Sequence, residues 1–426
     1  MKLRRFVLVT AILALVMSLG SFALAQDAKP SGDLEIFSWW TGGGEAAGLD
    51  ALIAKFKELY PDVTVINSAV AGGSGVNARA VLTTRMLGGD PPSTFQVHAG
   101  QELNALWVAA GRMEPLNDLY TANGWMEQFP QGLLDLISDS EGNIYSVPVN
   151  IHRSNVMWYV PAKLEEWGVT APTTWDEFLT TCETLKAAGV TPLAVGENWT
   201  QVHLWESVAL GVLGADGYKG LWNGATSWTS PEVTSVFDTF GKVLACSNDD
   251  RNALSWQDAS QRVANGEAAF NIMGDWAAGY FLVDLKLEPG TGFAWAPSPG
   301  TAGNFIMLSD TFGLPKGAPN PDAVRAWLSF IGSAEGQDIF NPLKGSLPAN
   351  TTADITNADL YNAYFQSAYT DWTTNVIVGS LQHGAVAPPA FLDGFGNLVA
   401  GFAAGGDSAT ATANAAVLAI QTGMVH

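Results

Sequence analysis

Apolar residues near the start of the chain fall into an alternating strand and helix pattern. Three short apolar runs predict strands, at 33–37, 63–66 and 94–97. The segments between them, 45–59 and 76–87, carry apolar residues every three or four positions, which is the spacing of one helix face. Strands that alternate with helices at this distance predict a parallel sheet with right-handed crossovers.

The α/β pattern continues toward the C-terminus. Further apolar runs predict strands at 144–149, 155–159, 192–195, 267–273 and 305–310, and helical patterns dominate 202–244, 323–332 and the region after 354. We expect Thr174 to cap a helix in a capping box with Glu177, and Asp275 to cap a later helix. About 400 residues exceed the size of one hydrophobic core, so two domains are expected.

The first 25 residues have the pattern of a secretory signal peptide. Three basic residues among the first five positions precede an apolar run over 6–19, and Ala23-Leu24-Ala25 supplies a small-x-small cleavage signature. The run is shorter than the about 18 apolar residues of a spanning helix, and no later segment reaches that length. We therefore expect an exported, periplasmic protein with no membrane insertion.

The chain is strongly acidic, with a formal net charge of −21 at pH 7 over 426 residues. Charge of this sign repels the phosphates of nucleic acid at long range, which argues against a nucleic-acid partner. Otherwise the acidity favours solubility and does not by itself indicate a function.

The chain has two cysteines, Cys182 and Cys246, and neither has the spacing of a metal ligand. An exported chain with an even number of cysteines can pair them, because the compartment is oxidising. The alternative is two buried, inert thiols. We predict the disulfide.

Tryptophan is abundant, with sixteen residues, and several stand at the ends of expected elements: Trp39, Trp40, Trp256 and Trp276. The carboxyl end of a strand is where open α/β sheets bind ligands. An indole face can stack on the apolar C–H face of a sugar ring while its N–H still donates a hydrogen bond. The alternative for any single Trp is packing in the core.

Gln96 and His98 alternate with apolar residues at the end of an expected strand. Both side chains can donate and accept hydrogen bonds, which suits the recognition of hydroxyl groups. The histidines show no metal-ligand pairing, and the glycines at 42–44 match no nucleotide-binding motif, so no cofactor is expected. No hydrolase motif is present, although two carboxylates could still flank a glycosidic bond.

Several blocks of sequence resemble bacterial extracellular solute-binding proteins, the sugar-binding subunits of ABC importers. These blocks follow the family order across nearly the whole chain: 36–40, 44–45, 56–65, 88–96, 155–159, 171–178, 265–276 and 344–349. Within the family, the chain is most similar to glucose- and galactose-type monosaccharide binders. Ten residues match positions that line the sugar pocket there: Trp39, Trp40, Glu45, Gln96, His98, Trp256, Trp276, Asp310, Lys344 and His383.

The resemblance implies roles for the polar residues among these ten. Glu45 and Asp310 would accept hydrogen bonds from sugar hydroxyls. Lys344, Gln96 and His98 would mainly donate, and His383 could do either.

The resemblance also implies a fold of two α/β lobes, of the type II-like periplasmic-binding-protein class, with a ligand cleft between lobes joined by a multi-strand hinge. The expected N-terminal lobe is 26–148 plus 305–346, and the expected C-terminal lobe is 149–304 plus 347–426. The protein would be a monomer without catalytic activity that delivers a monosaccharide to ABC permease subunits. The alternatives are an extracellular polysaccharide-active enzyme and a sensory sugar binder that feeds a receptor.

Overall fold

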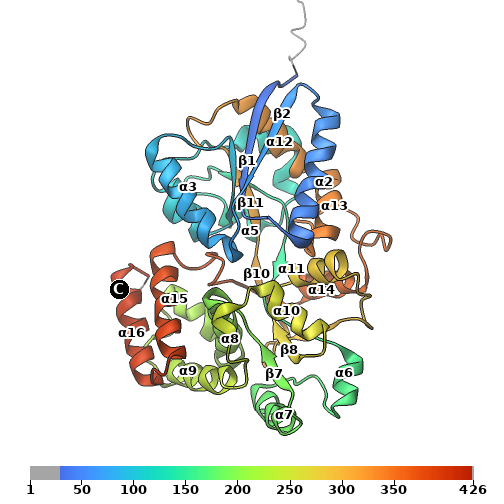
Figure 1. The fold of residues 1–426 in the computed structure, drawn as a ribbon. Helices are drawn as coiled ribbons and strands as arrows, with labels where there is room; N and C mark the ends of the chain where they lie inside the picture. The colour runs from blue at the N-terminus through green and yellow to red at the C-terminus, as the bar shows by residue number, and fades with distance from the viewer. Residues whose placement is uncertain (1–28, 425–426) are drawn as a thin grey trace, which may run out of the picture.

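The structure, a computed structural model, describes residues 29–424, and the expected signal peptide lies outside this range. The described chain forms two α/β lobes, one above the other in Figure 1, with a small sheet between them. No helix within 29–424 is both long and apolar enough to cross a bilayer. The expected two-lobe fold is confirmed.

The upper lobe in Figure 1, called the N-lobe, is built on a five-stranded sheet in the order β2-β1-β3-β11-β4. Its strands are β1 (Gly32–Ser38), β2 (Val63–Ala69), β3 (Thr94–His98), β4 (Ser146–Pro148) and β11 (Asp310–Gly313). β1 runs parallel to β2 and β3, whereas β11 runs antiparallel to β3 and β4. Its helices are α2 (Gly43–Leu59), α3 (Val76–Gly88), α4 (Asn117–Asn123), α5 (Gln131–Leu136), α12 (Pro321–Ile331) and α13 (Ala334–Lys344).

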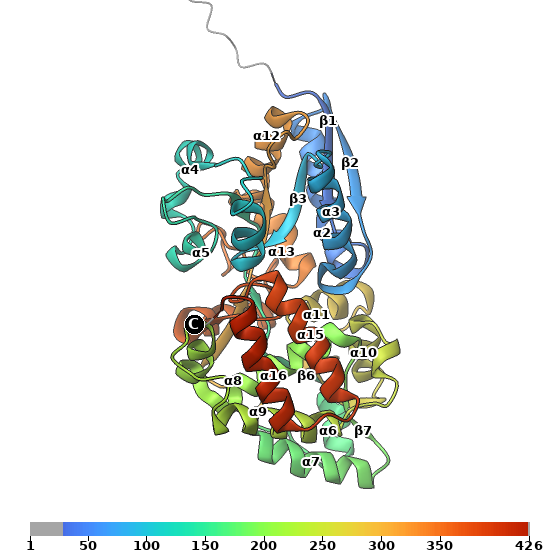
Figure 2. The ribbon, with the colours of Figure 1, turned by 90° about the vertical axis from the view of Figure 1, so that its left-hand side faces the viewer.

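The lower lobe, called the C-lobe, has a four-stranded sheet in the order β7-β8-β6-β9. Its strands are β6 (Val156–Tyr159), β7 (Thr191–Ala194), β8 (Ala268–Ile272) and β9 (Ala294–Pro297). Figure 2 shows α15 and α16 side by side along this lobe. The helices are α6 (Pro161–Glu166), α7 (Trp175–Ala187), α8 (Asn198–Asn223), α9 (Pro231–Leu244), α10 (Trp256–Ala264), α11 (Trp276–Gly279), α14 (Ala363–Thr374), α15 (Pro389–Ala403) and α16 (Ser408–Gln421).

A third sheet, the hinge sheet, joins the lobes in the order β12-β10-β5. It contains β5 (His152–Arg153), β10 (Asn304–Leu308) and β12 (Val376–Gly379). The strand expected at 305–310 is therefore two strands, because the chain leaves the hinge sheet after Leu308 and enters the N-lobe sheet at Asp310. This crossing places Asp310 between the lobes.

Shorter helical turns complete the described chain. They are η1 (Gly73–Gly75), η2 (Glu102–Val108), η3 (Trp125–Glu127), η4 (Arg251–Ala253) and η5 (Tyr280–Asp284). Most of the tryptophans pack in the cores, as Trp205 does against Trp228 and Phe395 in the C-lobe and Trp327 does against Phe56 in the N-lobe.

The two expected helix caps have different outcomes. The Thr174 side chain accepts a hydrogen bond from the Glu177 backbone, as expected, but the Glu177 carboxylate bonds to Thr173 rather than closing the box on Thr174. The expectation for Asp275 is wrong, because its side chain caps no helix. That carboxylate is fully buried and bonds instead to His152 and to the backbone of Arg153 in the hinge sheet.

The structure joins Cys182 to Cys246 in a disulfide across 64 positions of sequence, with a Cα–Cα distance of 6.1 Å. Cys182 lies in α7, and Cys246 follows α9 beside the start of β7, where its carbonyl oxygen accepts from Leu193. The bond therefore fastens two helices of the C-lobe to each other, away from the cleft.

Candidate functional site

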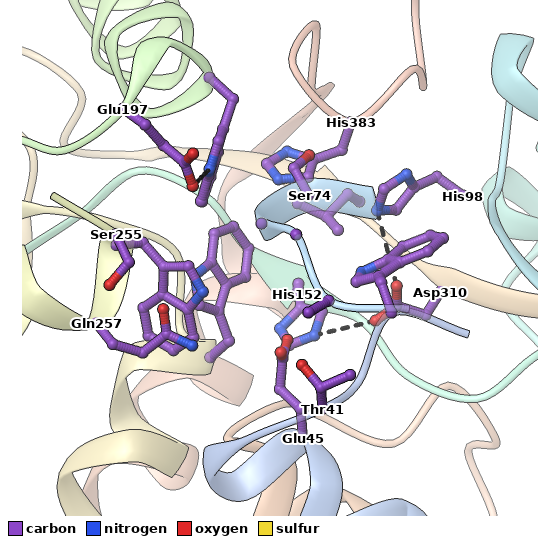
Figure 3. A pocket seen from close by; sticks show the side chains of 18 of the residues that line it. Thr41, Glu45, Ser74, His98, His152, Glu197, Ser255, Gln257, Asp310 and His383 are labelled. Carbon is purple, nitrogen blue, oxygen red and sulfur yellow. Dashed lines mark hydrogen bonds and ion pairs between the residues drawn. The ribbon is translucent and has the colours of Figure 1, made fainter. Parts of the chain in front are cut away.

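A cavity of about 260 Å³ lies between the lobes (Figure 3). The N-lobe side supplies Trp39, Thr41, Glu45, His98 and the loop 71–74. The C-lobe side supplies Glu197, Trp199, Ser255, Trp256, Gln257 and Trp276. His152 and Leu308 come from the hinge sheet, Asp310 and Lys344 from the ends of β11 and α13 in the N-lobe, and His383 from the loop after β12. Both lobes and the hinge thus contribute to one cavity.

Eight of the ten residues expected from the resemblance line this cavity, and Trp40 and Gln96 do not. Trp40 is 1% exposed and packs against Phe312 and Phe340. Gln96 is also 1% exposed; its carbonyl oxygen accepts from the Trp39 backbone, and its amide donates to Asp310 at 2.8 Å. Gln96 therefore fixes the positions of two lining residues, Trp39 and Asp310, without lining the cavity itself.

The loop after β1 brings Glu45 to the cavity. A Cβ on Gly44 would overlap the carbonyl oxygen of Leu343 and would crowd Gly279. Glycine at this position lets the start of α2 approach α13 and α11 closely. The close approach puts the Glu45 carboxylate 2.7 Å from the Lys344 ammonium.

Four indole rings form the apolar walls. Trp39, Trp199, Trp256 and Trp276 are only 4–7% exposed, so most of each ring is held by protein contacts. The Trp276 ring lies 6.2 Å from that of Trp199 and 5.1 Å from the imidazole of His383. Fixed aromatic faces of this kind can stack on the C–H face of a sugar ring without losing side-chain freedom on binding.

Asp310 is the centre of the polar part of the site. Its Oδ1 accepts from Gln96 and its Oδ2 from the Asn150 amide, each at 2.8 Å. His98 Nε2 and His152 Nε2 lie 3.7 and 3.3 Å from the same two oxygens. Burial alone would raise the pKa of Asp310, but the nearby His152 imidazole and the Lys344 charge hold it far below its ordinary value. The carboxylate is therefore ionised, with part of its acceptor capacity already used.

The two histidines beside Asp310 are each held by a second carboxylate. His98 Nδ1 lies 2.7 Å from Glu102, which itself lies 3.6 Å from Arg79. His152 Nδ1 bonds to Asp275. Burial lowers the pKa of His152, but the charge and hydrogen bond of Asp275, together with the nearby Asp310, outweigh this effect and leave it above its ordinary value. The site thus contains a chain of carboxylates and imidazoles that runs from the N-lobe through the hinge to the C-lobe.

Comparison with known proteins identifies the family. A model described as bacterial extracellular solute-binding protein matches residues 41–338. The chain belongs to this family. It is 36% identical to an uncharacterized ABC transporter extracellular-binding protein of Pyrococcus horikoshii, over 88% of this chain and 84% of that one. It is 33% identical to a probable sugar-binding periplasmic protein of Mesorhizobium japonicum, over 90% of this chain and 92% of that one.

Among solved structures, this solute-binding protein is similar in fold to the bacterial solute receptor AcbH, which is described as exclusively preferring β-D-galactopyranose. The TM-score is 0.80 at 20% identity, over 92% of this chain and 99% of that one. A chitin oligosaccharide binding protein matches with the same score, identity and coverage. These two likenesses establish the fold.

Several lining residues of this solute-binding protein were missed by the sequence analysis: Thr41, His152, Glu197, Trp199, Ser255 and Gln257. Glu197 and Trp199 follow the strand expected at 192–195, which is the signal that picked out Trp39 after the first strand. The same reasoning would have found them. His152 carries no such signal, because its place depends on the hinge sheet.

A second buried cluster of this solute-binding protein, behind the cavity, consists of His203, Glu206 and His383, whose ligand atoms lie within 4.8 Å of one another. The Glu206 oxygens accept from the hydroxyls of Ser154 and Ser380 and from the backbone of 381–382. These hydrogen bonds join Glu206 to the loop that carries His383.

Proposed function

We propose that this protein is the sugar-binding component of an ABC importer and captures a monosaccharide of the glucose or galactose type. It would act as a monomer in the periplasm after removal of the first 25 residues, and it would deliver the sugar unchanged to the membrane permease. The relatives named above as a sugar-binding periplasmic protein and an ABC transporter binding protein support the sugar and the importer.

The observation that carries the proposal is the composition of the cavity. Four indole faces surround a polar group that includes an ionised Asp310, the Glu45–Lys344 pair and three histidines. A sugar ring needs both kinds of surface, because it has apolar C–H faces and a rim of hydroxyls that must regain hydrogen bonds when water leaves. Charged acceptors and donors make the stronger of these bonds.

The size of the cavity supports a single sugar ring. Its volume of about 260 Å³ lies just below the roughly 300–1,000 Å³ typical of pockets for drug-sized ligands. The structural neighbours are described for ligands of both kinds, a galactopyranose and a chitin oligosaccharide, so they do not decide the length.

Sugar binding would change the angle between the lobes at the hinge and would involve no catalytic step. The cavity walls come from both lobes, so a sugar that contacts both would favour the closed arrangement over an open one. The permease would then recognise the closed form. Asp310 and His152 lie on the connecting strands, where they would contact the sugar and join the lobes at the same time.

A thermal-shift panel of glucose, galactose, mannose, xylose, maltose and cellobiose tests the proposal, because a tight ligand raises the melting temperature by mass action. We expect the largest shift with a hexose, and chromatography should recover that hexose unchanged. A shift with maltose or cellobiose alone would overturn the monosaccharide assignment. Conversion of a disaccharide would indicate the enzyme instead.

A further inference from the structure

The carboxylates that line the cavity each have a basic side chain nearby, with one exception. Glu45 is paired with Lys344 at 2.7 Å. Asp310 is surrounded by two histidines and two amides. Glu197 differs from both, because no Lys, Arg or His nitrogen within residues 29–424 lies within 4.0 Å of its carboxylate.

Only one of the two carboxylate oxygens of Glu197 accepts a hydrogen bond from the residues that the structure describes. Its Oε1 accepts from the indole Nε1 of Trp199 at 2.9 Å, and Oε2 has no hydrogen-bond partner in the described part of the chain. The residue precedes α8 without capping it through its side chain. Its backbone N–H donates to the carbonyl oxygen of Leu254 at 2.8 Å, which fixes where the side chain starts.

Glu197 also stands apart from the other charges. Figure 3 shows it at the upper left of the cavity, away from Glu45 at the bottom and Asp310 at the right. The nearest walls are aromatic, since Trp199 is its hydrogen-bond partner and the Trp276 ring lies 6.2 Å from the Trp199 ring.

We propose that Glu197 makes this site selective for a sugar that carries a protonated amine, that is, an amino sugar of the hexosamine class. The inference rests on the proposed sugar-binding function and specifies its ligand. The ammonium group would lie against the free Oε2 of Glu197, with the indole faces beside it, while the hydroxyl rim meets Asp310 and Glu45.

The physical reason is the cost of an unpaired charge. Glu197 is partly buried, and a ligand that fills the cavity would remove further water from its carboxylate. Loss of hydration without a partner of opposite charge is unfavourable for an ionised group. A hydroxyl donates one hydrogen bond to the carboxylate but carries no charge to balance it. An ammonium offers a charge-assisted hydrogen bond and a favourable cation–π contact with the indoles.

The test is calorimetric titration of the full-length mature protein with matched sugars: glucose, glucosamine and N-acetylglucosamine, and the same three of the galactose series. The acetylated sugars keep the nitrogen but carry no charge. We expect the amino sugar to bind about tenfold or more tightly than its neutral parent, a difference of about 1.4 kcal/mol. We expect acetylation to remove this advantage.

The matched variants are Glu197→Gln and Glu165→Gln. Glutamine keeps an oxygen for Trp199 but has no charge, and Glu165 is an exposed residue of α6 far from the cavity lining. Glu197→Gln should weaken the amino sugar about tenfold or more without a matching loss for the neutral parent, so that the preference for the amine disappears. Glu165→Gln should change neither.

The two hypotheses fail in distinguishable ways. Neutral hexoses that bind as tightly as their amino analogues in the wild-type protein would overturn this inference and leave the sugar-binding proposal standing. A preference for the amine that survives in Glu197→Gln would also overturn it. Binding of no sugar in the panel would overturn the proposed function and the inference together.

Discussion

Trp39 and Trp40 are neighbours in sequence with opposite environments. Successive side chains of an extended segment point to opposite sides, so Trp39 reaches the cavity while Trp40 enters the core behind it. The same geometry explains Gln96 and His98, which share one face of β3. His98 stands at the end of the strand and reaches the cavity, whereas Gln96 lies one layer deeper.

The indole walls give the first prediction at this scale. Trp256→Ala and Trp276→Ala should each weaken sugar binding by about 1–3 kcal/mol, the range of buried aromatic anchors. Trp167→Ala is the control, because Trp167 ends α6 outside the cavity. Calorimetric titration measures the change. Equal affinity in Trp256→Ala, Trp276→Ala and the control would refute the stacking of the sugar on these rings.

The second prediction at the scale of single residues concerns Asp310. An Asn side chain in its place would put an amide N–H against one of the two amide donors that Asp310 now satisfies. We expect Asp310→Asn to lose tight sugar binding and also to lower the stability of the sugar-free protein, by about 1–3 kcal/mol for the unsatisfied donor.

Denaturant unfolding without sugar measures this cost, and Asp238→Asn on the exposed face of α9 is the control. The acceptor role alone, as expected from the sequence, would leave stability unchanged. A variant as stable as the control would therefore contradict the structural part of the role.

Among the elements, the disulfide between α7 and the end of α9 gives a third prediction. A closed loop with a sequence separation of 64 is worth about 4 kcal/mol in the chain-entropy model. Cys182→Ser with Cys246→Ser should lower the free energy of unfolding by up to this amount and leave sugar affinity unchanged, because the bond lies away from the cavity. Thiol titration of the denatured, unreduced wild type should find no free thiol; two would disprove the bond.

Helix α8 gives a prediction about pH. Burial lowers the pKa of His203 to about 3, from an ordinary 6.5. The folded protein therefore keeps this imidazole neutral, while the unfolded chain takes up a proton below pH 6.5. The contribution to stability is complete above pH 6.5 and is lost as the pH falls toward 3, by at most about 1.4 kcal/mol per pH unit.

His203→Phe removes this titration. The difference in free energy of unfolding between wild type and variant should fall as the pH is lowered from 7 to 4. Burial raises the pKa of Glu206 to about 7, and Glu206 lies 3.7 Å from His203, so both proteins are compared in a Glu206→Gln background that removes this second titration. A difference that does not change with pH would show that folding does not lower the pKa of His203.

Over the whole molecule, local sequence patterns predicted where helices and strands lie, but they did not predict which elements contact one another. The segment from β1 to β3 matches its expected strands and helices to within three residues at each end, because apolar spacing is a local signal. The break between β10 and β11 has no local signal, since both strands are mostly buried and only Ser309 separates them. It depends on which sheet each strand joins.

In the candidate site, too, the sequence predicted positions along the chain better than it predicted contacts. The family resemblance placed eight residues on the cavity, but it could not separate lining residues from their supports. Asp275 illustrates the reason. Its partner His152 is 123 positions away in sequence, so nothing near Asp275 distinguishes a helix cap from a buried ion pair. Burial and pairing of this kind are properties of the folded chain alone.

The proposed function requires that the two lobes hold one sugar ring between them. Calorimetric titration of the mature protein with single hexoses and with the matching disaccharides measures this. We expect saturable binding of one hexose per protein, with disaccharides at least about tenfold weaker because the cavity of about 260 Å³ holds a single ring. Binding of a disaccharide more tightly than of either hexose would contradict this requirement.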